Sequence, residues 1–137
     1  MDKMLEELKK LKSVYNAVSE FAVGSQLKVK VKTLTSEEET EVHTYAMGYE
    51  QGLAYLYSVK RESLCKAIIA LNGNEIPEIV EQGAEKVQRH IWLRTNVICG
   101  WSQMLIDQVW NKYAELIGSV EEKIGQDIVE ENKKETK

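Results

Sequence analysis

Few residues of this 137-residue sequence have a type and a spacing that could support catalysis or metal binding. Cys65 and Cys99 have no C-x-x-C spacing, and His43 and His90 lie far apart, with no Cys, Asp or Glu at metal-ligand spacing. Both cysteines stand in apolar, helical contexts. We therefore expect two small buried thiols in a reducing compartment, and two histidines at the surface or at helix caps.

The acidic run 37–39 could be taken for a metal-binding or acid–base cluster. Adjacent residues of a helix point in different directions, so three consecutive glutamates cannot converge on one ion or bond. Thr35 and Ser36 precede this run at the spacing of a capping box, which predicts a helix start. The glutamates would then lie at the positive end of the helix dipole.

The sequence has no dinucleotide-binding glycine motif, no P-loop, no nucleophile elbow and no HExxH zinc motif. Without any of these arrangements, we predict that the chain is not an enzyme. We accordingly expect no catalytic residue, no cofactor-binding residue and no metal ligand.

Composition and charge exclude several classes of partner. With 43% hydrophobic and 29% charged residues, the chain should fold as one globular domain without disulfide bonds or structural metal ions. A net charge of −4, with no Lys/Arg cluster flanked by aromatics, argues against nucleic-acid binding. No apolar run has the length of a membrane span or the form of a signal peptide, so we expect no membrane partner and a cytoplasmic location.

An amphipathic helix is predicted over residues 1–22, because apolar side chains recur at alternating spacings of four and three residues. These are Met4, Leu8, Leu11, Tyr15 and Val18. Such a seam suits packing on the chain's own domain or on another subunit, and we favour packing on a larger body.

The segment 27–33 alternates between apolar and basic residues, which predicts a strand with one covered and one solvated face. Farther along, the stretch 58–77 places Leu64, Ile68 and Leu71 at helical spacing. We expect one compact helix there, ended by the pair Asn72 and Gly73. This helix should be the element around which the core is built.

Aromatic residues mark the candidate contact surfaces. Tyr45 and Tyr49 fall on one side of a helical pattern, in which Gly48 and Gly52 predict a close contact or a kink. The three tryptophans lie nine residues apart in a long helical pattern from Val87 to Leu116, so they should face different neighbours, some in the core and some at a contact surface. The candidate protein-interface residues are Leu8, Leu11, Tyr15, Tyr45, Tyr49, Trp92, Trp101 and Trp110.

Three further features complete the predicted architecture. Pro77 should force Ile76 out of helical geometry and open the next helix, and Gly100 is a possible bend in the long helical pattern. The charged residues 130–137 predict a disordered tail. We therefore predict a mainly α fold with a small β element: an N-terminal helix over 1–22, a helical core over 23–118, and a polar extension over 119–137.

Three segments resemble the small assembly proteins of tailed bacteriophages, namely the base-plate hub assembly family of T-even-like phages and the tail assembly chaperones. The first is the strand 27–31, LKVKV, followed by the helix start 34–39, LTSEEE. The second is the segment 60–73, KRESLCKAIIALNG, and the third is 101–113, WSQMLIDQVWNKY. The long N-terminal seam departs from the usual short start of that group.

This resemblance implies protein binding without catalysis. The expected role is a chaperone in tail or base-plate assembly in the host cytoplasm, with other phage tail or base-plate proteins as partners and a homo-oligomer possible. A second reading is a permanent virion subunit of the base plate, neck or connector. A third, of another class, is a small regulatory protein that binds a host enzyme.

Overall fold

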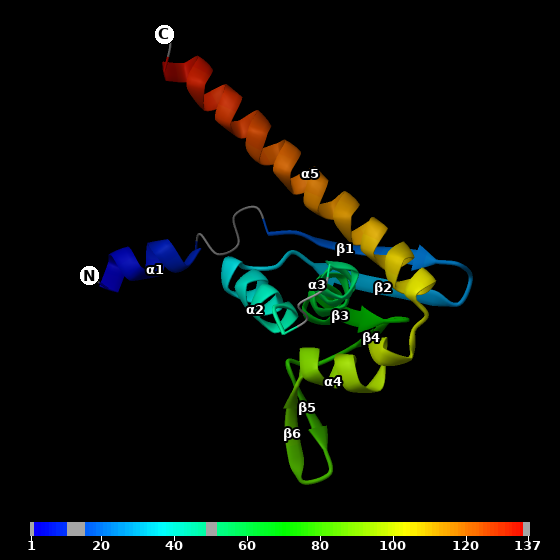
Figure 1. Ribbon diagram of the computed structural model, residues 1–137. Helices are drawn as coiled ribbons and strands as arrows, with labels where there is room; N and C mark the ends of the chain where they lie inside the picture. The colour runs from blue at the N-terminus through cyan, green and yellow to red at the C-terminus, as the bar shows by residue number, and fades with distance from the viewer. Residues whose placement is uncertain (1, 11–15, 49–51, 136–137) are drawn as a thin grey trace.

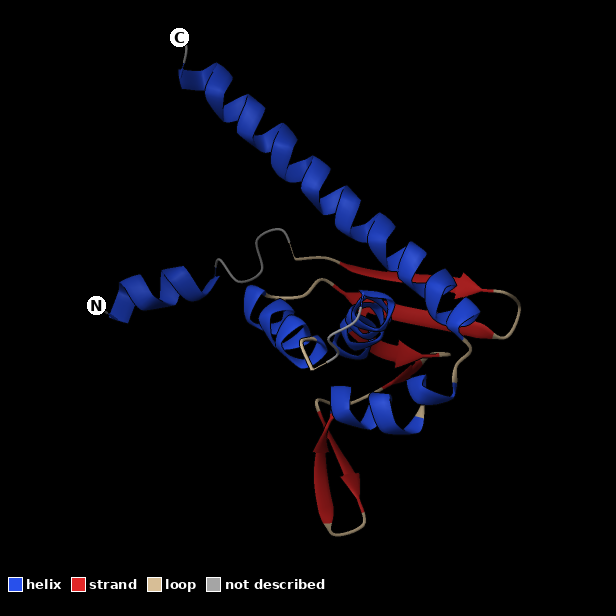
Figure 2. Cartoon of the chain, viewed as in Figure 1, coloured by secondary structure: helices blue, strands red, loops and turns tan. Residues whose placement is uncertain are grey.

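The computed structural model describes residues 2–10, 16–48 and 52–135 (Figure 1). Helices and strands are interspersed along the chain, and the strands form one larger sheet and one separate hairpin (Figure 2). In order, the elements are α1 (Asp2–Lys10), β1 (Val18–Val23), β2 (Leu27–Lys32), α2 (Ser36–Ala46), α3 (Gly52–Ala67), β3 (Ile68–Leu71), β4 (Asn74–Glu75), β5 (Ile79–Gln82), β6 (Glu85–Gln88), α4 (Arg89–Asn96), the 3-10 turn η2 (Ile98–Gly100) and α5 (Gln103–Glu135). The fold is mainly α with a small antiparallel sheet, as predicted.

The main sheet is antiparallel with the strand order β1-β2-β3-β4. The predicted strand at 27–33 is confirmed as β2, and its alternation has the expected consequence: Val29 and Val31 are fully buried. Lys28 pairs with Glu20 of β1 at 3.2 Å. Such exposed lysines also discourage pairing with the edges of other sheets.

The pair Asn72 and Gly73 ends a strand, not a helix. Helix α3 stops at Ala67, and Ile68 continues as β3. Asn72 (φ 51°) and Gly73 (φ 80°) both adopt the left-handed conformation that a two-residue hairpin turn requires, and they connect β3 to β4. The predicted single helix through Leu71 is therefore wrong, because a short apolar run fits a buried strand as well as a helix.

Helix α2 begins as the sequence predicts. The backbone N–H of Glu38 donates to the Thr35 hydroxyl at 3.2 Å, and the Thr35 N–H donates to the Glu38 carboxylate at 3.0 Å, which completes the capping box. The helix ends at Ala46 and α3 begins at Gly52. Gly48 therefore follows the end of α2 and Gly52 begins α3, so the expected kink within one helix is wrong.

The region after β4 differs from the prediction. Instead of a helix opening at Pro77, β5 and β6 form a separate hairpin, in which Ile79 pairs with Gln88. The long helical pattern from Val87 is divided into α4, η2 and α5, and Gly100 closes the 3-10 turn at the division. This division confirms the bend expected there, and it separates the three tryptophans onto different elements.

The hydrophobic core lies between the main sheet and helices α3, α4 and α5. Its fully buried side chains include Leu64 and Ile68 at the junction of α3 and β3, together with Leu93, Ile98 and Val109. The expectation that the segment around Leu64 is central is therefore confirmed, although its secondary structure changes at Ala67. Of the two cysteines, Cys65 is buried as expected, but Cys99 is exposed.

Both ends of the chain depart from the predicted architecture. Helix α1 ends at Lys10, and Val18 belongs to β1, so the helix expected over 1–22 is shorter. At the other end, α5 continues to Glu135, so most of the tail predicted as disordered from Glu130 is helical. Figure 1 shows α1 and the last part of α5 extending away from the core. Within the described ranges, no helix is long and apolar enough to cross a membrane.

Candidate functional site

The predicted interface residues fall on several elements. Leu8, on α1, is 53% exposed, and Tyr45, at the end of α2, is 43% exposed. The three tryptophans are partly buried and pack against one core, from α4, from the residue after η2, and from α5. The predicted interface residues therefore include both side chains that pack on the core and side chains that are exposed. Leu11, Tyr15 and Tyr49 lie outside the described residues.

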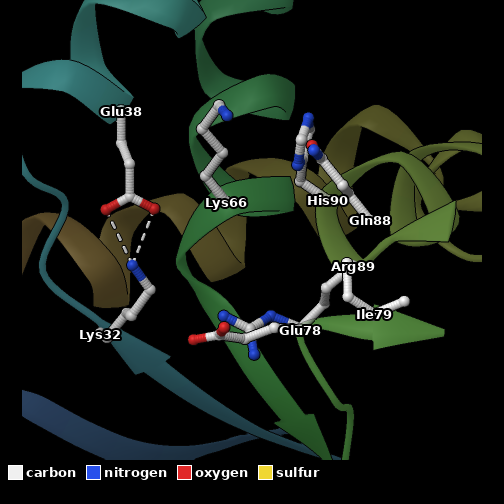
Figure 3. Close-up of a pocket in the computed structure, with 8 residues that line it drawn as sticks. All are labelled: Lys32, Glu38, Lys66, Glu78, Ile79, Gln88, Arg89 and His90. Atoms are coloured by element: carbon white, nitrogen blue, oxygen red, sulfur yellow. Dashed lines mark hydrogen bonds and ion pairs between the residues drawn. The ribbon is translucent and has the colours of Figure 1, made fainter.

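A polar cleft of about 270 Å³ opens between β2, α2, α3 and the start of α4. Figure 3 shows Lys32 reaching Glu38, with Lys66 and His90 on the other side of the cleft. The Lys32 ammonium lies 2.8 Å from both carboxylate oxygens of Glu38. Lys66, whose side chain is only 8% exposed, donates to Glu41 at 2.5 Å. Both lysines are thus engaged by carboxylates of α2.

These ion pairs alter the acidity of the carboxylates. Burial alone would raise the pKa of Glu38, but the hydrogen bonds from Lys32 and from the Thr35 backbone outweigh it and hold the pKa below its ordinary value of 4.5. The hydrogen bond from Lys66 likewise lowers the pKa of Glu41. Burial, together with the charges of Lys66 and Arg94, lowers the pKa of His90, which favours the neutral imidazole. The ion pairs in the cleft therefore connect α2 to β2 and to α3.

The ion pair between Lys32 and Glu38 predicts an acid-sensitive contribution to stability. Because the pKa of Glu38 is lowered on folding, its contribution is fully present above about pH 4.5 and is lost as the pH falls through the folded-state value. We expect wild type to lose about 0.5–1 kcal/mol more than Glu38→Gln between pH 5 and pH 3, since the pair is partly exposed. Urea unfolding at each pH measures this.

Glu37→Gln is the matched control, because Glu37 is the exposed neighbouring acid on the same helical turn. It should follow the wild-type dependence on pH. A Glu38→Gln protein whose stability falls as steeply as wild type would show that this pair contributes nothing.

A buried ion pair joins α3 to α4. The Arg94 guanidinium donates from Nε to both carboxylate oxygens of Glu62, at 2.8 and 3.0 Å, and also from Nη2. Glu62 is 2% exposed. Arg94 lies 4.3 Å from the centroid of the Tyr45 ring, which covers it in a cation–π contact. Tyr45 is thus both partly exposed and attached to this pair.

Cys65 is the buried thiol nearest to this network, but its environment opposes ionisation. Burial, reinforced by the charge of Glu62, raises the pKa of Cys65 to about 12. Since the thiolate and not the thiol is the nucleophile, Cys65 is unreactive at neutral pH. It behaves as the small buried side chain that the sequence predicts.

An apolar groove of about 300 Å³ lies between α2, α3 and α5. Its apolar lining comes from Leu34, Val42, Val59, Trp110, Tyr113, Ala114 and Ile117. Glu39 and Glu121 contribute the acidic groups of its lining. Burial raises the pKa of the Tyr113 hydroxyl to about 12, so this residue stays neutral in the groove. The groove therefore combines an apolar lining with acidic side chains.

Beside the groove, the facing ends of α2 and α3 expose a set of apolar side chains, here called the α2–α3 patch. Its members are Tyr45, Met47, Leu53, Leu56 and Tyr57, which are between 40% and 71% exposed. Leu56 lies one helical turn before Val59, a residue of the groove lining. His43 also lines the groove, and its Nδ1 lies 2.9 Å from the Tyr55 hydroxyl. The patch and the groove therefore adjoin one another along α3.

The sequence prediction named only Tyr45 from this patch. Leu53 and Leu56, which carry exposed apolar surface of α3, were not singled out from the sequence. The available signal was the pair of glycines at 48 and 52, which marks a helix–helix connection and therefore an exposed end.

Metal-binding geometry and similarity to known proteins add no indication of function. Among the described residues, no group of three or more His, Cys, Asp or Glu side chains is arranged to hold a metal ion. Comparisons with models of known families, with curated proteins and with solved structures gave no match. The geometry of the surfaces themselves is therefore what indicates function.

Proposed function

We propose that this chain is a non-enzymatic protein-binding factor whose docking surface is the apolar groove together with the α2–α3 patch. The observation that carries the proposal is the continuity of these two features along α3. Exposed apolar surface next to an apolar groove is typical of protein interaction sites. A helix with a narrow apolar face fits such a groove, and the acidic residues Glu39 and Glu121 favour basic residues beside that face.

The polar groups support binding over catalysis, because they are engaged with one another. Lys32 binds Glu38, Lys66 binds Glu41, and Arg94 binds Glu62. The thiol of Cys65 remains protonated at neutral pH. This arrangement stabilises the positions of α2, α3 and α4, and hence the shape of the groove.

We further propose that the partners are phage tail or base-plate proteins. The support is the sequence resemblance of the segments 27–39, 60–73 and 101–113 to phage assembly proteins. These segments contribute β2, the start of α2, the second half of α3, β3 and the first part of α5. The resemblance therefore covers several of the elements that form the core and part of the groove lining.

Replacing Leu53 and Leu56 together by serine should abolish partner binding without changing the fold, because both side chains are more than half exposed. Truncating a central apolar contact typically weakens an interface by about 2 kcal/mol or more, which corresponds to at least a 30-fold loss. Co-purification from cells that produce the tail and base-plate proteins measures the loss, and circular dichroism monitors the fold.

Met104→Ser is the control, since Met104 is 75% exposed on α5 and does not line the groove. It should bind like wild type. Retention of binding by the Leu53→Ser/Leu56→Ser protein would rule out this surface. Recovery of a host enzyme with no tail protein would instead favour the regulatory role.

Mass spectrometry of purified particles separates the two phage roles. A chaperone should be absent from the mature particle, whereas a structural subunit should be present at a fixed copy number. The Leu53→Ser/Leu56→Ser change should reduce particle yield in either case.

A further inference from the structure

The outer edge of β1 is open along its whole length. Strands β1 and β4 are the outer strands of the main sheet, and no further strand of the described chain pairs with either. The β4 edge is only two residues long, which limits pairing with another chain, whereas β1 offers six residues. Strand β1 also contains no proline, lysine or bulge of the kinds that protect a sheet edge. The β1 edge can therefore accept another strand.

Alternate residues of β1 direct their backbone groups toward this edge. The Thr33 N–H donates to the Ala17 carbonyl at 2.9 Å, so these two residues form a hydrogen-bonded pair of the antiparallel ladder. Because backbone direction alternates along a strand, every second residue from Ala17 onward faces β2. The residues between them point outward, and these are Val18, Glu20 and Ala22. An extended polypeptide is the ligand whose backbone matches three N–H and three C=O groups at this spacing.

A hollow beside the edge can receive side chains of an added strand. It has a volume of about 270 Å³, lies between β1 and α5, and has Phe21 and Leu116 as its apolar lining. Its polar lining consists of Ser19, Lys112, Glu115 and Ser119. Figure 1 shows α5 crossing β1 and continuing past its free edge, so an added strand would lie beside α5. Its residues opposite Ser19 and Phe21 would point toward α5, because directly opposed residues share a face of the sheet.

Charge defines the residue that fits at the centre of the added strand. Glu20 is the one charged residue of β1, and its carboxylate lies 3.2 Å from the Lys28 ammonium on the inner side of the strand. The Glu20 side chain is 39% exposed, so it can bind a second cation from the open side. A lysine or arginine directly opposite Glu20 would make a favourable cross-strand pair. The segment that fits therefore has a basic residue at its centre, with aliphatic residues on both sides of it.

A second copy of β1 is a poorer occupant. About a two-fold axis, only one antiparallel register pairs all the outward groups of both strands, with Val18 of each copy opposite Ala22 of the other. That register places Glu20 directly opposite Glu20 of the second copy, and like charges at opposed positions destabilise a strand pair. Charge complementarity therefore favours a basic segment of another protein.

We propose that β1 binds an extended segment of a partner protein as a fifth, antiparallel strand of the main sheet, with a lysine or arginine opposite Glu20 and an aliphatic side chain in the hollow beside α5. This site is distinct from the apolar groove, since the two share no lining residue. It does not depend on the docking surface proposed above. The protein thus has one surface suited to a helix and a separate edge suited to a strand.

The blocked pentapeptide acetyl-TVKVT-amide tests this site in the full chain. Its lysine should lie opposite Glu20, and its valines should face α5. In NMR experiments on isotope-labelled protein, millimolar peptide should slow amide hydrogen exchange at Val18, Glu20 and Ala22. Exchange at Phe21 should not change, because its N–H already faces β2. The absence of any change, or equal slowing at all residues of β1, would overturn the proposal.

Peptide variants test the register without altering the protein. Methylation of the lysine amide nitrogen, which faces β1, should weaken binding at least about 10-fold, whereas methylation of the first valine nitrogen, which faces away, should not. Glu20→Lys should weaken binding of acetyl-TVKVT-amide about 5-fold and strengthen binding of acetyl-TVEVT-amide. Equal effects of the two methyl groups, or no exchange of charge preference, would contradict the proposed pairing.

Changes at Ala22 test the edge from the side of the protein. Ala22→Pro removes an outward N–H and no bond to β2, so the sheet should persist in circular dichroism while peptide binding falls about 10-fold. Ala22→Thr is the matched control and should bind like wild type. If Ala22→Pro unfolds, the methylated peptides decide.

Two further measurements separate this site from the alternatives. The Leu53→Ser/Leu56→Ser protein should bind the peptide like wild type, so failure of the proposed docking surface and failure of this site are distinguishable. Light scattering should give the chain mass of 15.7 kDa for wild type without peptide. Twice that mass, with the amides of Val18, Glu20 and Ala22 protected before peptide is added, would overturn the proposal and identify a second copy as the occupant.

Discussion

Replacing Ile68 by aspartate is expected to unfold the domain. Ile68 is fully buried where α3 passes into β3, and its backbone pairs with Val31 in the centre of the sheet. The change removes a large apolar side chain and places a carboxylate in the hydrophobic core. Loss of the apolar group alone is worth about 2–5 kcal/mol, and the buried charge adds several more. This sum reaches the whole stability of a typical domain, which is about 5–15 kcal/mol.

Circular dichroism and urea unfolding measure this effect. Met104→Asp is the matched control, because Met104 is 75% exposed in the first turn of α5, where an acid is favourable to the helix dipole. The control should keep the wild-type unfolding midpoint. A folded Ile68→Asp protein with a wild-type midpoint would show that the junction of α3 and β3 is not part of the core.

Arg94→Met should lower the free energy of unfolding by about 3–5 kcal/mol. The change leaves Glu62, which is 2% exposed, without the guanidinium that binds it from α4. An uncompensated buried carboxylate is the main cause of the loss, since methionine preserves much of the arginine volume. The Tyr45 ring also loses its cation–π partner. Urea unfolding at pH 7 measures the difference.

The double variant Glu62→Gln/Arg94→Met separates the ion pair from packing. With the buried charge removed, it should recover more than half of the stability that Arg94→Met loses. If Arg94→Met costs less than about 1 kcal/mol, water reaches Glu62 and the pair is not a buried connection between α3 and α4.

Local patterns predicted those elements in which one physical signal dominates. The alternation of valine and lysine in 27–33 gave β2, and the spacing from Thr35 to Glu38 gave the start of α2 through its capping box. The position of Leu64 in the core followed from helical spacing. In each case, the local sequence pattern is sufficient to indicate the element or the burial.

The secondary-structure predictions were wrong where contacts between residues distant in sequence decide between two locally possible structures. Ile68 to Leu71 suits either a helix end or a strand, and pairing with β2 selects the strand. Val18 continues a helical seam by spacing, yet its pairing opposite Lys32 places it in β1. The separate hairpin of β5 and β6 has few apolar residues to signal it. Tertiary pairing overrides local preference at all three places.

The candidate docking surface was only partly predictable for a related reason. Tyr45 was identified from its aromatic character, but its contact with Arg94 depends on α4 approaching α2. Leu53 and Leu56 are more than half exposed on α3, but they belong to no motif that the sequence alone reveals. The groove is formed by three helices, and no single segment contains its pattern.

The order of strands in the main sheet has a consequence for how the chain acquires its structure. Strands β2 and β3 are neighbours in space, but residues 33 to 67 separate them along the chain. During synthesis, the ribosome therefore releases the first hairpin well before its third strand exists. Closing such long loops slows folding. Until β3 pairs with β2, the hairpin of β1 and β2 leaves Val29 and Val31 in contact with water. Nascent chains that stall before Leu71 should accordingly be the species that chaperones of the cell hold and that aggregates recruit.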